Sequence, residues 1–308
     1  MKKLVLVTVF IVLGIVVFAG GAGEGDMVEE SFSFSGIDKL TVEGSFFEVD
    51  ITGSSTATIE AEFVVPARLR ARGVNVLHET RGSELRVWVE RKVISIMVPP
   101  RGGPRMRFTV PVNTLVDVKN SSGSVAVEGI EADELNLEVS SGSLQIDNCR
   151  SNLSATSSSG KIRVEACTGD KKLTASSGSI TVLDSNGDIE ADTSSGKHRY
   201  ERIEGSIAAH SSSGGIAIRD SEGKLDVKSN SGRLSGTGVA ITGDSSFETS
   251  SGSIDFDFTN SGSDFTFELR SSSGTISAGG SRAKGTVITG NGKILIKGKS
   301  SSGSQSYK

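Results

Sequence analysis

The chain is poor in the residues from which most catalytic and metal sites are built. Its 308 residues include three histidines, two cysteines and one tryptophan. A catalytic serine needs a base beside it, and His78, His198 and His210 recur in no pairing with the many serines. We therefore expect no enzyme, no cofactor and no metal site.

An excess of positive charge is also lacking. Without Lys2 and Lys3 the chain has 31 basic and 37 acidic residues, a net charge of about −6. Nucleic acid would require a basic face, so we exclude it as a partner. The balance suits a soluble exported protein.

The N-terminus has the three parts of a secretory signal. Lys2 and Lys3 precede an apolar run from Leu4 to Phe18, and small residues follow. We predict a signal peptide at residues 1–22, cut after Ala19 or Ala22, and export to the periplasm, cell surface or extracellular space. An uncleaved anchor is the alternative, because the run is nearly long enough to span a bilayer. No cysteine follows that could carry a lipid.

Residues 27–120 read as a lead-in of short β-strands with irregular loops. Apolar and polar residues alternate in several segments, no helical period appears, and all five prolines fall here. Arginines are concentrated between Arg68 and Arg107. A loop with Arg101, Arg105 and Arg107 is a candidate site for anionic glycans or phosphate groups. The alternative is a set of solvated strand faces, because Arg68, Arg70 and Arg72 alternate as outward positions would.

A Ser-Ser-Gly triplet organises the rest of the chain. It or a close variant returns every 18 to 22 residues, with its glycine at Gly123, Gly142, Gly160, Gly178, Gly196, Gly214, Gly232, Gly252, Gly274 and Gly292. A fixed period of this size predicts a repeat architecture. We interpret the glycines as turn residues that adopt backbone angles forbidden to other residues, and the serines as partners for nearby amides or for serines of the next repeat.

Apolar residues fall into columns around each triplet. The positions five before, two after and four after the glycine are mostly Ile, Val, Leu or Ala. Two short strands per repeat cannot bury these faces alone, so the repeats must stack. The sequence thus predicts an all-β, parallel β-solenoid over residues 121–297, with right-handed coils of about 18 residues. Residues 298–308 are rich in Ser, Gly and Lys and are expected to be disordered.

This pattern resembles a bacterial family of unknown function. The triplet followed by apolar-x-apolar, with the Phe108–Val118 strand before the first triplet, is similar to members described as putative adhesins with β-strand repeats, which are related to head domains of autotransporter-like adhesins. The resemblance covers residues 32–297. It implies an exported, non-enzymatic, surface-associated β-solenoid, and some relatives are linked to envelope-stress systems.

The two cysteines occupy one column on adjacent coils. Cys149 and Cys167 each lie seven residues after a triplet glycine. Neighbouring strands are about 4.8 Å apart, which is within the Cα separation that a disulfide accepts. We predict a disulfide, favoured by an oxidising compartment. Two free thiols in one column are the alternative.

The apolar columns are broken at one coil by His198 and Tyr200. Such a break is a candidate binding site, although a polar residue inside a stack is more often satisfied by its neighbours. The phenylalanines between Phe247 and Phe267 coincide with the longest repeats and predict a wider coil filled by larger side chains.

We expect an exported binding or structural module, an adhesin, with an unknown partner such as an anionic glycan, an envelope component or another protein. An envelope-stress scaffold or sensor is one alternative. A polysaccharide-acting enzyme is the other, with Asp184, Asp188 and Asp192, Asp220 with Glu222, or Asp255 with Asp257 as its carboxylates. Open ends of a solenoid also favour end-to-end self-association.

Overall fold

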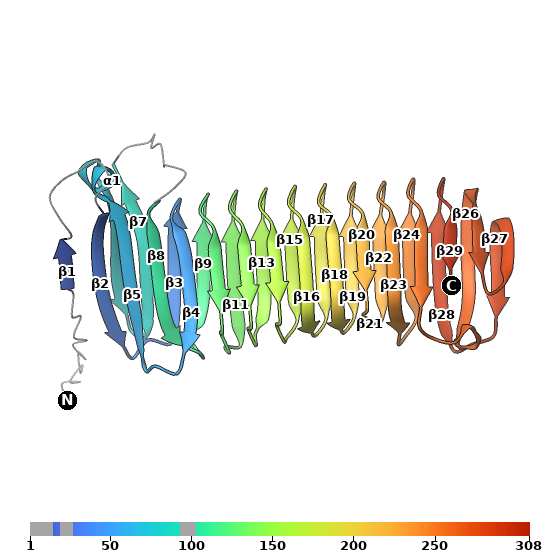
Figure 1. Ribbon diagram of the computed structural model, residues 1–308, viewed down its shortest axis with the longest axis horizontal. Helices are drawn as coiled ribbons and strands as arrows, with labels where there is room; N and C mark the ends of the chain where they lie inside the picture. Colours follow the sequence, from blue (N-terminus) through green and yellow to red (C-terminus); the bar gives the residue numbers. More distant parts are fainter. Residues whose placement is uncertain (1–14, 19–26, 93–102) are drawn as a thin grey trace, which may run out of the picture.

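The protein is a long stack of β-strands (Figure 1). The computed structural model describes residues 15–18, 27–92 and 103–308, so most of the predicted signal peptide lies outside the described residues. The 29 described strands form one continuous sheet. The predicted all-β solenoid is confirmed, and its right-handed winding stays a prediction.

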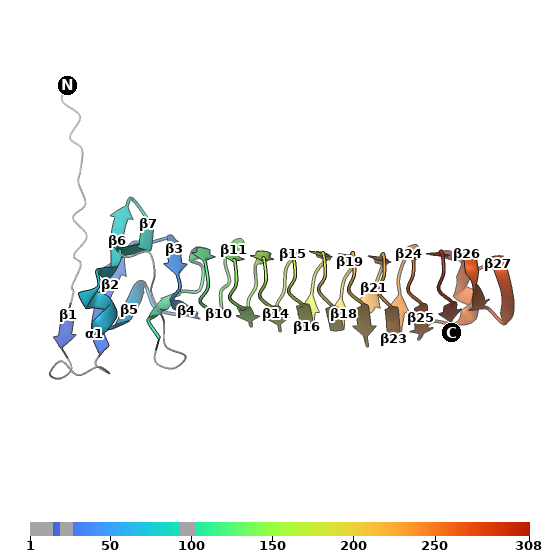
Figure 2. The same cartoon turned by 90° about the horizontal axis from the view of Figure 1, so that it is seen from above.

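From β9 to β25 each coil contributes one strand to each of two walls, and the strands of each wall pair in parallel with their equivalents one coil away (Figure 2). The first wall contains β9 (Leu115–Asn120), β11 (Glu134–Val139), β13 (Asn152–Ser157), β15 (Lys171–Ala175), β17 (Ile189–Thr193), β19 (Ile207–Ser211), β22 (Leu225–Ser229) and β24 (Ser245–Thr249). The second wall contains β10 (Val125–Glu128), β12 (Leu144–Asp147), β14 (Ile162–Glu165), β16 (Ile180–Asn186), β18 (His198–Glu204), β20 (Ile216–Arg219), β23 (Leu234–Ile241) and β25 (Ile254–Phe258). The short β21 (Glu222–Gly223) extends the β20 side of one coil.

The predicted apolar columns form the core between the walls. In one coil Ala155, Ile162 and Val164 are all buried, and their equivalents pair in register, as in Leu144–Ile162–Ile180. The widened coils are filled as expected. Phe247 and Phe256 are buried with ring centroids 4.3 Å apart, and Phe256 fills the space above Gly236.

The triplet glycines are required by close packing between coils, not by unusual backbone angles. A Cβ on Gly160 would lie 1.6 Å from the carbonyl oxygen of Gly142, while none of the triplet glycines has a positive φ. The positive angles fall six residues later, where Asn148, Ala166, Asp184, Arg202 and Asp220 have φ between 47° and 54°. Our explanation of these glycines was therefore wrong.

The N-terminal strands form the first coils of the same stack, in an order that differs from the sequence. They are β2 (Met27–Ser35), β3 (Lys39–Ser45), β4 (Glu48–Ser54), β5 (Thr58–Pro66), β6 (Val74–Arg81), β7 (Glu84–Arg91) and β8 (Arg105–Pro111). Strand β3 lies between β7 and β9, and β4 lies between β8 and β10. The coil of β3 and β4 is thus enclosed by strands that follow it in the chain. Strand β1 (Ile15–Phe18), which belongs to the predicted signal peptide, pairs with β2.

One segment of the lead-in is helical. The structure forms α1 (Ala67–Ala71), which turns Leu69 into the core, so the strand-like alternation predicted for Arg68, Arg70 and Arg72 is wrong. The preceding Pro66 ends β5, and its fixed φ and missing N–H suit the start of a helix.

The C-terminal segment is an ordered coil, which corrects the predicted disordered tail at residues 298–308. After the turn η1 (Gly262–Asp264) come β26 (Phe265–Ala278), β27 (Ser281–Gly290), β28 (Ile294–Ser300) and β29 (Gln305–Tyr307). Strands β28 and β29 lie between β24–β25 and β26, so the last coil of the chain is not the last coil of the stack. The solenoid does not end at residue 297.

Two further details follow from this order. The triplet of the inserted coil is Ser301-Ser302-Gly303, whose glycine lies in the column between Gly252 and Gly274. Gly292, predicted to belong to that column, instead lies against Asp264 and Phe265. Tyr307 is buried among Phe247, Phe258 and Phe267, with centroids 5.8 to 6.2 Å away, and this apolar contact orders the tail.

Candidate functional site

Several arginines of the lead-in lie in ion pairs, either with another strand or within their own strand. Arg86 is 2.5 Å from Glu43, Arg81 is 2.9 Å from Glu79, and Arg70 contacts Glu30. The exposed members of such pairs contribute little stability, because water screens them. The pairing nevertheless places a carboxylate beside each of these three arginines.

The structure separates the three arginines of the predicted loop. Arg101 lies outside the described residues. Arg105 and Arg107 lie on β8, where Nη1 of Arg107 is 3.2 Å from Glu62 and its Nε is 4.0 Å from Asp50. Arg105 is half-buried, and its Nε–H donates no hydrogen bond to the described residues. Arg105 and Arg107 are therefore strand residues at the edge of the predicted loop.

His198 and Tyr200 point into the core, which contradicts their prediction as a binding site. They are 2 % and 0 % exposed, and Nδ1 of His198 lies 2.8 Å from the Tyr200 hydroxyl. Nε2 of His198 lies 2.8 Å from the Thr193 hydroxyl, which donates to Ser211 at 3.0 Å. Burial lowers the pKa of His198 to about 4 and raises the pKa of Tyr200. These groups satisfy one another inside the stack.

A row of buried hydroxyls precedes the triplets. The residue three before the glycine, such as Ser157, Ser211 or Ser229, accepts a hydrogen bond from the glycine N–H at 2.8 Å. Ser229 also donates to the carbonyl of Gly214 one coil away, at 2.9 Å. The two serines of most triplets are exposed. The sequence prediction thus named the right residue type at the wrong position, although the recurrence of Ser or Thr three before the glycine was the available signal.

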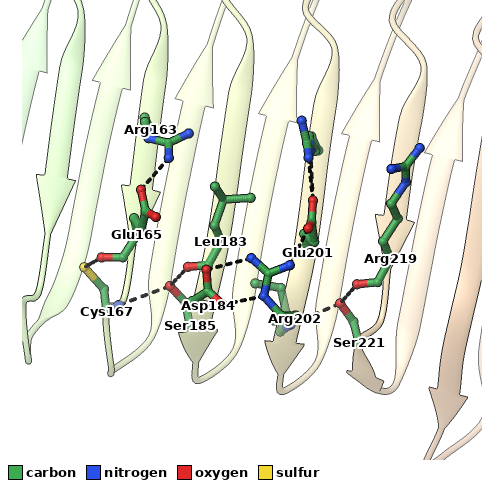
Figure 3. Close-up of polar contacts among 12 residues, drawn as sticks. Arg163, Glu165, Cys167, Leu183, Asp184, Ser185, Glu201, Arg202, Arg219 and Ser221 are labelled. Carbon is green, nitrogen blue, oxygen red and sulfur yellow. Dashed lines mark hydrogen bonds and ion pairs between the residues drawn. The ribbon is translucent and has the colours of Figure 1, made fainter.

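The cysteines are two free thiols in the described structure, not the predicted disulfide. They belong to a column that continues with Ser185. Each of these side chains donates a hydrogen bond to the backbone carbonyl two residues earlier in its own coil. The Cys167 sulfur contacts the Glu165 carbonyl at 3.1 Å, and Ser185 donates to the Leu183 carbonyl at 2.7 Å (Figure 3). The Cys167 sulfur also accepts from the Cys149 N–H at 3.4 Å. The two thiols are thus held by backbone groups, and the hydrogen bond to Cys167 with burial raises the pKa of Cys149.

Outside this column the coil corner carries ion pairs. Arg202 reaches back one coil to Asp184, with Nε and Nη2 at 2.5 and 2.8 Å, and also contacts Glu201 (Figure 3). Arg163 contacts Glu165 in the same way on its own strand. The arginine lowers the pKa of Asp184 by hydrogen bonding. The arginines at this corner, Arg163 and Arg202, are thus balanced by neighbouring carboxylates.

The first wall carries a groove of about 570 Å³ that crosses five successive coils. Its sides come from β11, β13, β15, β17 and β19, and the half-buried Ser206 precedes β19 at its edge. Its exposed lining residues are Glu134, Asn136, Asn152, Ser154, Asp170, Lys172, Asp188, Glu190 and Ala208. The sequence alone did not reveal this groove, because the groove is formed by outward-facing residues that are 18 positions apart in the chain and become neighbours only when the strands stack. The chain thus presents carboxylate, amide, hydroxyl and ammonium groups along one continuous line.

One side of the groove is fixed by a ladder of side chains. Asn152 accepts from the Asp170 N–H at 3.2 Å, Asp170 accepts from the Asp188 N–H at 3.0 Å, and Asp188 accepts from the Ser206 N–H at 2.8 Å. Each bond uses one side-chain oxygen, so the second carboxylate oxygen of Asp170 and Asp188 and the amide nitrogen of Asn152 are held in defined places. Lys172 lies 3.7 Å from Glu190 on the opposite side.

A buried lysine lies below the groove. Lys171 occupies an inward column otherwise filled by Leu and Ile, is 2 % exposed, and donates to the carbonyls of Gly169 and Asn186 at 2.7 and 2.8 Å. Burial lowers its pKa. Its ammonium group is turned away from the surface, so Lys172 supplies the exposed positive charge of the groove.

The carboxylates weighed for a hydrolase do not form one constellation. Asp184 is paired with Arg202, Asp188 caps the Ser206 amide, and Asp192 lies 3.6 Å from Nδ1 of His210. Asp255 is paired with Arg233 at 2.8 Å. Among the described residues, no three His, Cys, Asp or Glu side chains are grouped so that they could hold a metal ion. Within the same ranges no helix is long and apolar enough to cross a membrane.

The fold and the groove define a class of protein, the β-solenoid with a long polar face. Residues 112–202 and 202–308 each match the model of the family Toastrack DUF4097, and the chain belongs to that family. This agrees with the resemblance inferred from the triplets as far as the family is concerned. No curated protein matches the chain.

Several solved structures are similar to the chain. A putative adhesin from Bacteroides fragilis is 13% identical, with a TM-score of 0.45 over 92% of this chain and 97% of that one. A putative adhesin from Parabacteroides distasonis is 13% identical, with a TM-score of 0.40 over 76% and 98%. A putative lipid binding protein from the same species is 13% identical, with a TM-score of 0.35 over 91% and 97%.

Proposed function

We propose that the protein is an exported, non-enzymatic binding module of the cell surface or envelope, an adhesin whose binding face is the first wall. The observation that carries this proposal is the groove across five coils. A polymer lying along the stack would meet equivalent positions on successive strands about 4.8 Å apart. Solenoids commonly use such extended faces for binding.

The chemistry of the groove favours a hydroxyl-rich chain such as a polysaccharide. The carboxylates of Asp170 and Asp188 each keep an oxygen free of the ladder to accept from hydroxyl groups, and Lys172 can donate. Ser154 and Asn136 add groups that donate and accept. An anionic glycan would have to approach Lys172 past these acids, so a neutral glycan fits this face better than the anionic one expected from the arginines.

Binding of the purified protein to immobilised polysaccharides and to cell-envelope fractions tests the proposal. Ala208 lies in the groove, and Ala217 lies on the outward face of the second wall of the same coil. We expect Ala208→Arg to reduce retention on a bound polysaccharide about tenfold or more, and Ala217→Arg to leave it unchanged. Equal effects of both variants, or no retention on any polysaccharide or envelope fraction, would contradict the proposal.

The same experiment separates the alternatives. Release of new chain ends from a polysaccharide during incubation would favour the hydrolase. Capture of envelope proteins that survives Ala208→Arg would favour a scaffold or sensor. Fractionation of cells tests export, because a protein that stays in the cytoplasm with its first 22 residues intact cannot act as a surface adhesin.

A further inference from the structure

The two ends of the stack carry different strand edges. At the C-terminal end, β27 pairs with β26 and has no second partner among the described strands. At the other end, β2 pairs with β5 on one side and with β1 on the other (Figure 1). An edge strand with free N–H and C=O groups can accept a strand from another chain.

The leader strand β1 occupies a short part of the β2 edge. Four residues of β1 pair in antiparallel register with Val28–Ser31, from Ile15 opposite Ser31 to Phe18 opposite Val28. These four residues belong to the predicted signal peptide. Removal of that peptide would leave the same part of β2 without a partner on this side.

We propose that Ser281–Lys284 of β27 from a second copy takes the place of β1 in the mature protein, so that chains associate head to tail. Four residues of β27, Ser281–Lys284, pair with the half of β26 that continues the second wall. This is the same length of strand that β1 supplies. The proposal rests on removal of the leader, which is part of the proposed function.

Strand directions match at the two ends. Strands β25, β29 and the second half of β26 are parallel, and β27 runs opposite to them. At the other end β8 is parallel to β4 and β10, β5 runs opposite to β8, and β2 runs opposite to β5. In a coaxial continuation of the stack, β27 of one copy therefore meets β2 of the next in antiparallel orientation, as β1 does.

Charges at the two ends are complementary. Arg282 and Lys284 are exposed on β27, two residues apart and hence on one face. Glu29 is exposed within the part of β2 that β1 covers, and Glu60 is exposed one strand further from the contact, on β5 opposite Ser33. Opposite charges on neighbouring strands stabilise their pairing. Further along the same edge strand, Ile288 is 72 % exposed and gains apolar contact if a second end covers it.

The contact joins two different surfaces, so it repeats without closing. Such a heterologous interface along one axis produces open filaments. The leader strand would then act as a removable cap that keeps the chain monomeric before export. This gives the leader a second role in addition to targeting.

Among the described residues the first member of the buried cluster is Phe34, so a chain that begins at residue 27 keeps every described member of that cluster. The test compares the full chain, kept soluble in mild detergent, with residues 27–308 in the same detergent by light scattering over a concentration series. We expect residues 27–308 to form oligomers that grow with concentration, and the full chain to stay monomeric. Residues 27–308 that stay monomeric at the highest soluble concentration would overturn the proposal.

Charge reversal distinguishes this contact from other association. We expect Arg282→Glu with Lys284→Glu to weaken association of residues 27–308 about tenfold or more, and added Glu29→Lys with Glu60→Lys to restore it. Lys172→Glu, on the wall, is the control and should have no effect. Failure of the four-residue reversal to restore association would contradict the pairing of β27 with β2. No polysaccharide is present, so this outcome is independent of the adhesin experiment.

Discussion

The Nδ1 of His198 lies 2.8 Å from the hydroxyl of Tyr200, within columns that hold only Ile and Val in the two adjacent coils. The inserted C-terminal coil repeats this arrangement with a different residue. There the Tyr307 hydroxyl donates to Gln305 at 3.1 Å, and Gln305 donates to Ser300 at 2.9 Å. Each polar pair is tolerated inside the stack because a hydroxyl three residues before the triplet glycine hydrogen-bonds to its remaining polar atom. This hydroxyl belongs to Thr193 for His198 and to Ser300 for Gln305.

The Gln305–Tyr307 pair suggests that glutamine can replace His198 and thereby remove a pH dependence of the stability. Folded His198 has a pKa of about 4 because of burial, below its ordinary 6.5, so between these values the unfolded state binds a proton that the folded state does not. Stability is then full above about pH 6.5 and decreases as the pH falls toward 4. We expect urea unfolding to show a loss of about 2–3 kcal/mol from pH 7 to 4.5 that is absent in His198→Gln.

The exposed His210 supplies the control for that measurement. His210→Gln should keep the loss of stability seen in the unmodified protein, because His210 lies on the outward face of β19. An unchanged pH profile in His198→Gln would contradict the buried neutral imidazole.

Ala166 is strained by its position at a coil corner. Its φ is 53°, whereas Gly129 and Gly238 occupy the same column elsewhere with φ of 70° and 68°. We expect Ala166→Gly to raise the free energy of unfolding by about 0.5–1 kcal/mol, since relief of the left-handed strain exceeds the entropy lost by glycine. The control, Ala217→Gly within β20, should lower it by a similar amount, and stabilisation by neither change would exclude the strain.

The serine before the triplet should contribute more than the serines within it. Ser157 accepts from the Gly160 N–H at 2.8 Å and is buried, whereas Ser159 is exposed. We expect Ser157→Ala to cost about 1–3 kcal/mol in chemical denaturation, because the glycine N–H loses its partner. Ser159→Ala should stay within about 0.5 kcal/mol. Equal costs would contradict this prediction, because the exposed triplet hydroxyl would then contribute as much as the buried one.

The C-terminal residues should be essential for stability. Removal of residues 301–308 deletes β29, and with it the contacts of Tyr307 with three phenylalanines and the pairing of β29 with both β25 and β26. Loss of one large buried aromatic side chain alone costs about 3–5 kcal/mol. We expect a large fall in the melting temperature by circular dichroism, with Lys308 deletion as a milder comparison. An unchanged melting temperature would restore the interpretation of this segment as a tail.

The thiols of Cys149 and Cys167 should be free and protected. Both are buried and bonded to backbone groups, so a thiol reagent should react slowly with the folded protein and with two thiols after unfolding without reductant. If no thiol reacts in the unfolded, unreduced protein, Cys149 and Cys167 form a disulfide and this prediction is wrong.

Part of the candidate site was readable from the sequence and part was not. The break at His198 and Tyr200 was visible, but only the structure showed that Thr193 and Ser211 satisfy it from within. The groove was not visible, since Asp170 and Asp188 gain meaning only when stacking places one above the other. The arginines were visible as a cluster, whereas the acidic partners of Arg86 and Arg107 lie on strands far away in the chain.

The sequence by itself determined the coil. Its period, its inward columns and its glycines follow from local alternation and from close approach between identical turns, both of which repeat every 18 residues. Only the tertiary structure decided the order of the coils at the two ends, where β3–β4 and β28–β29 lie between strands distant from them in the chain. Local patterns state that a face must be buried, whereas the choice of the covering strand depends on side-chain fit, as when Tyr307 completes the phenylalanine cluster.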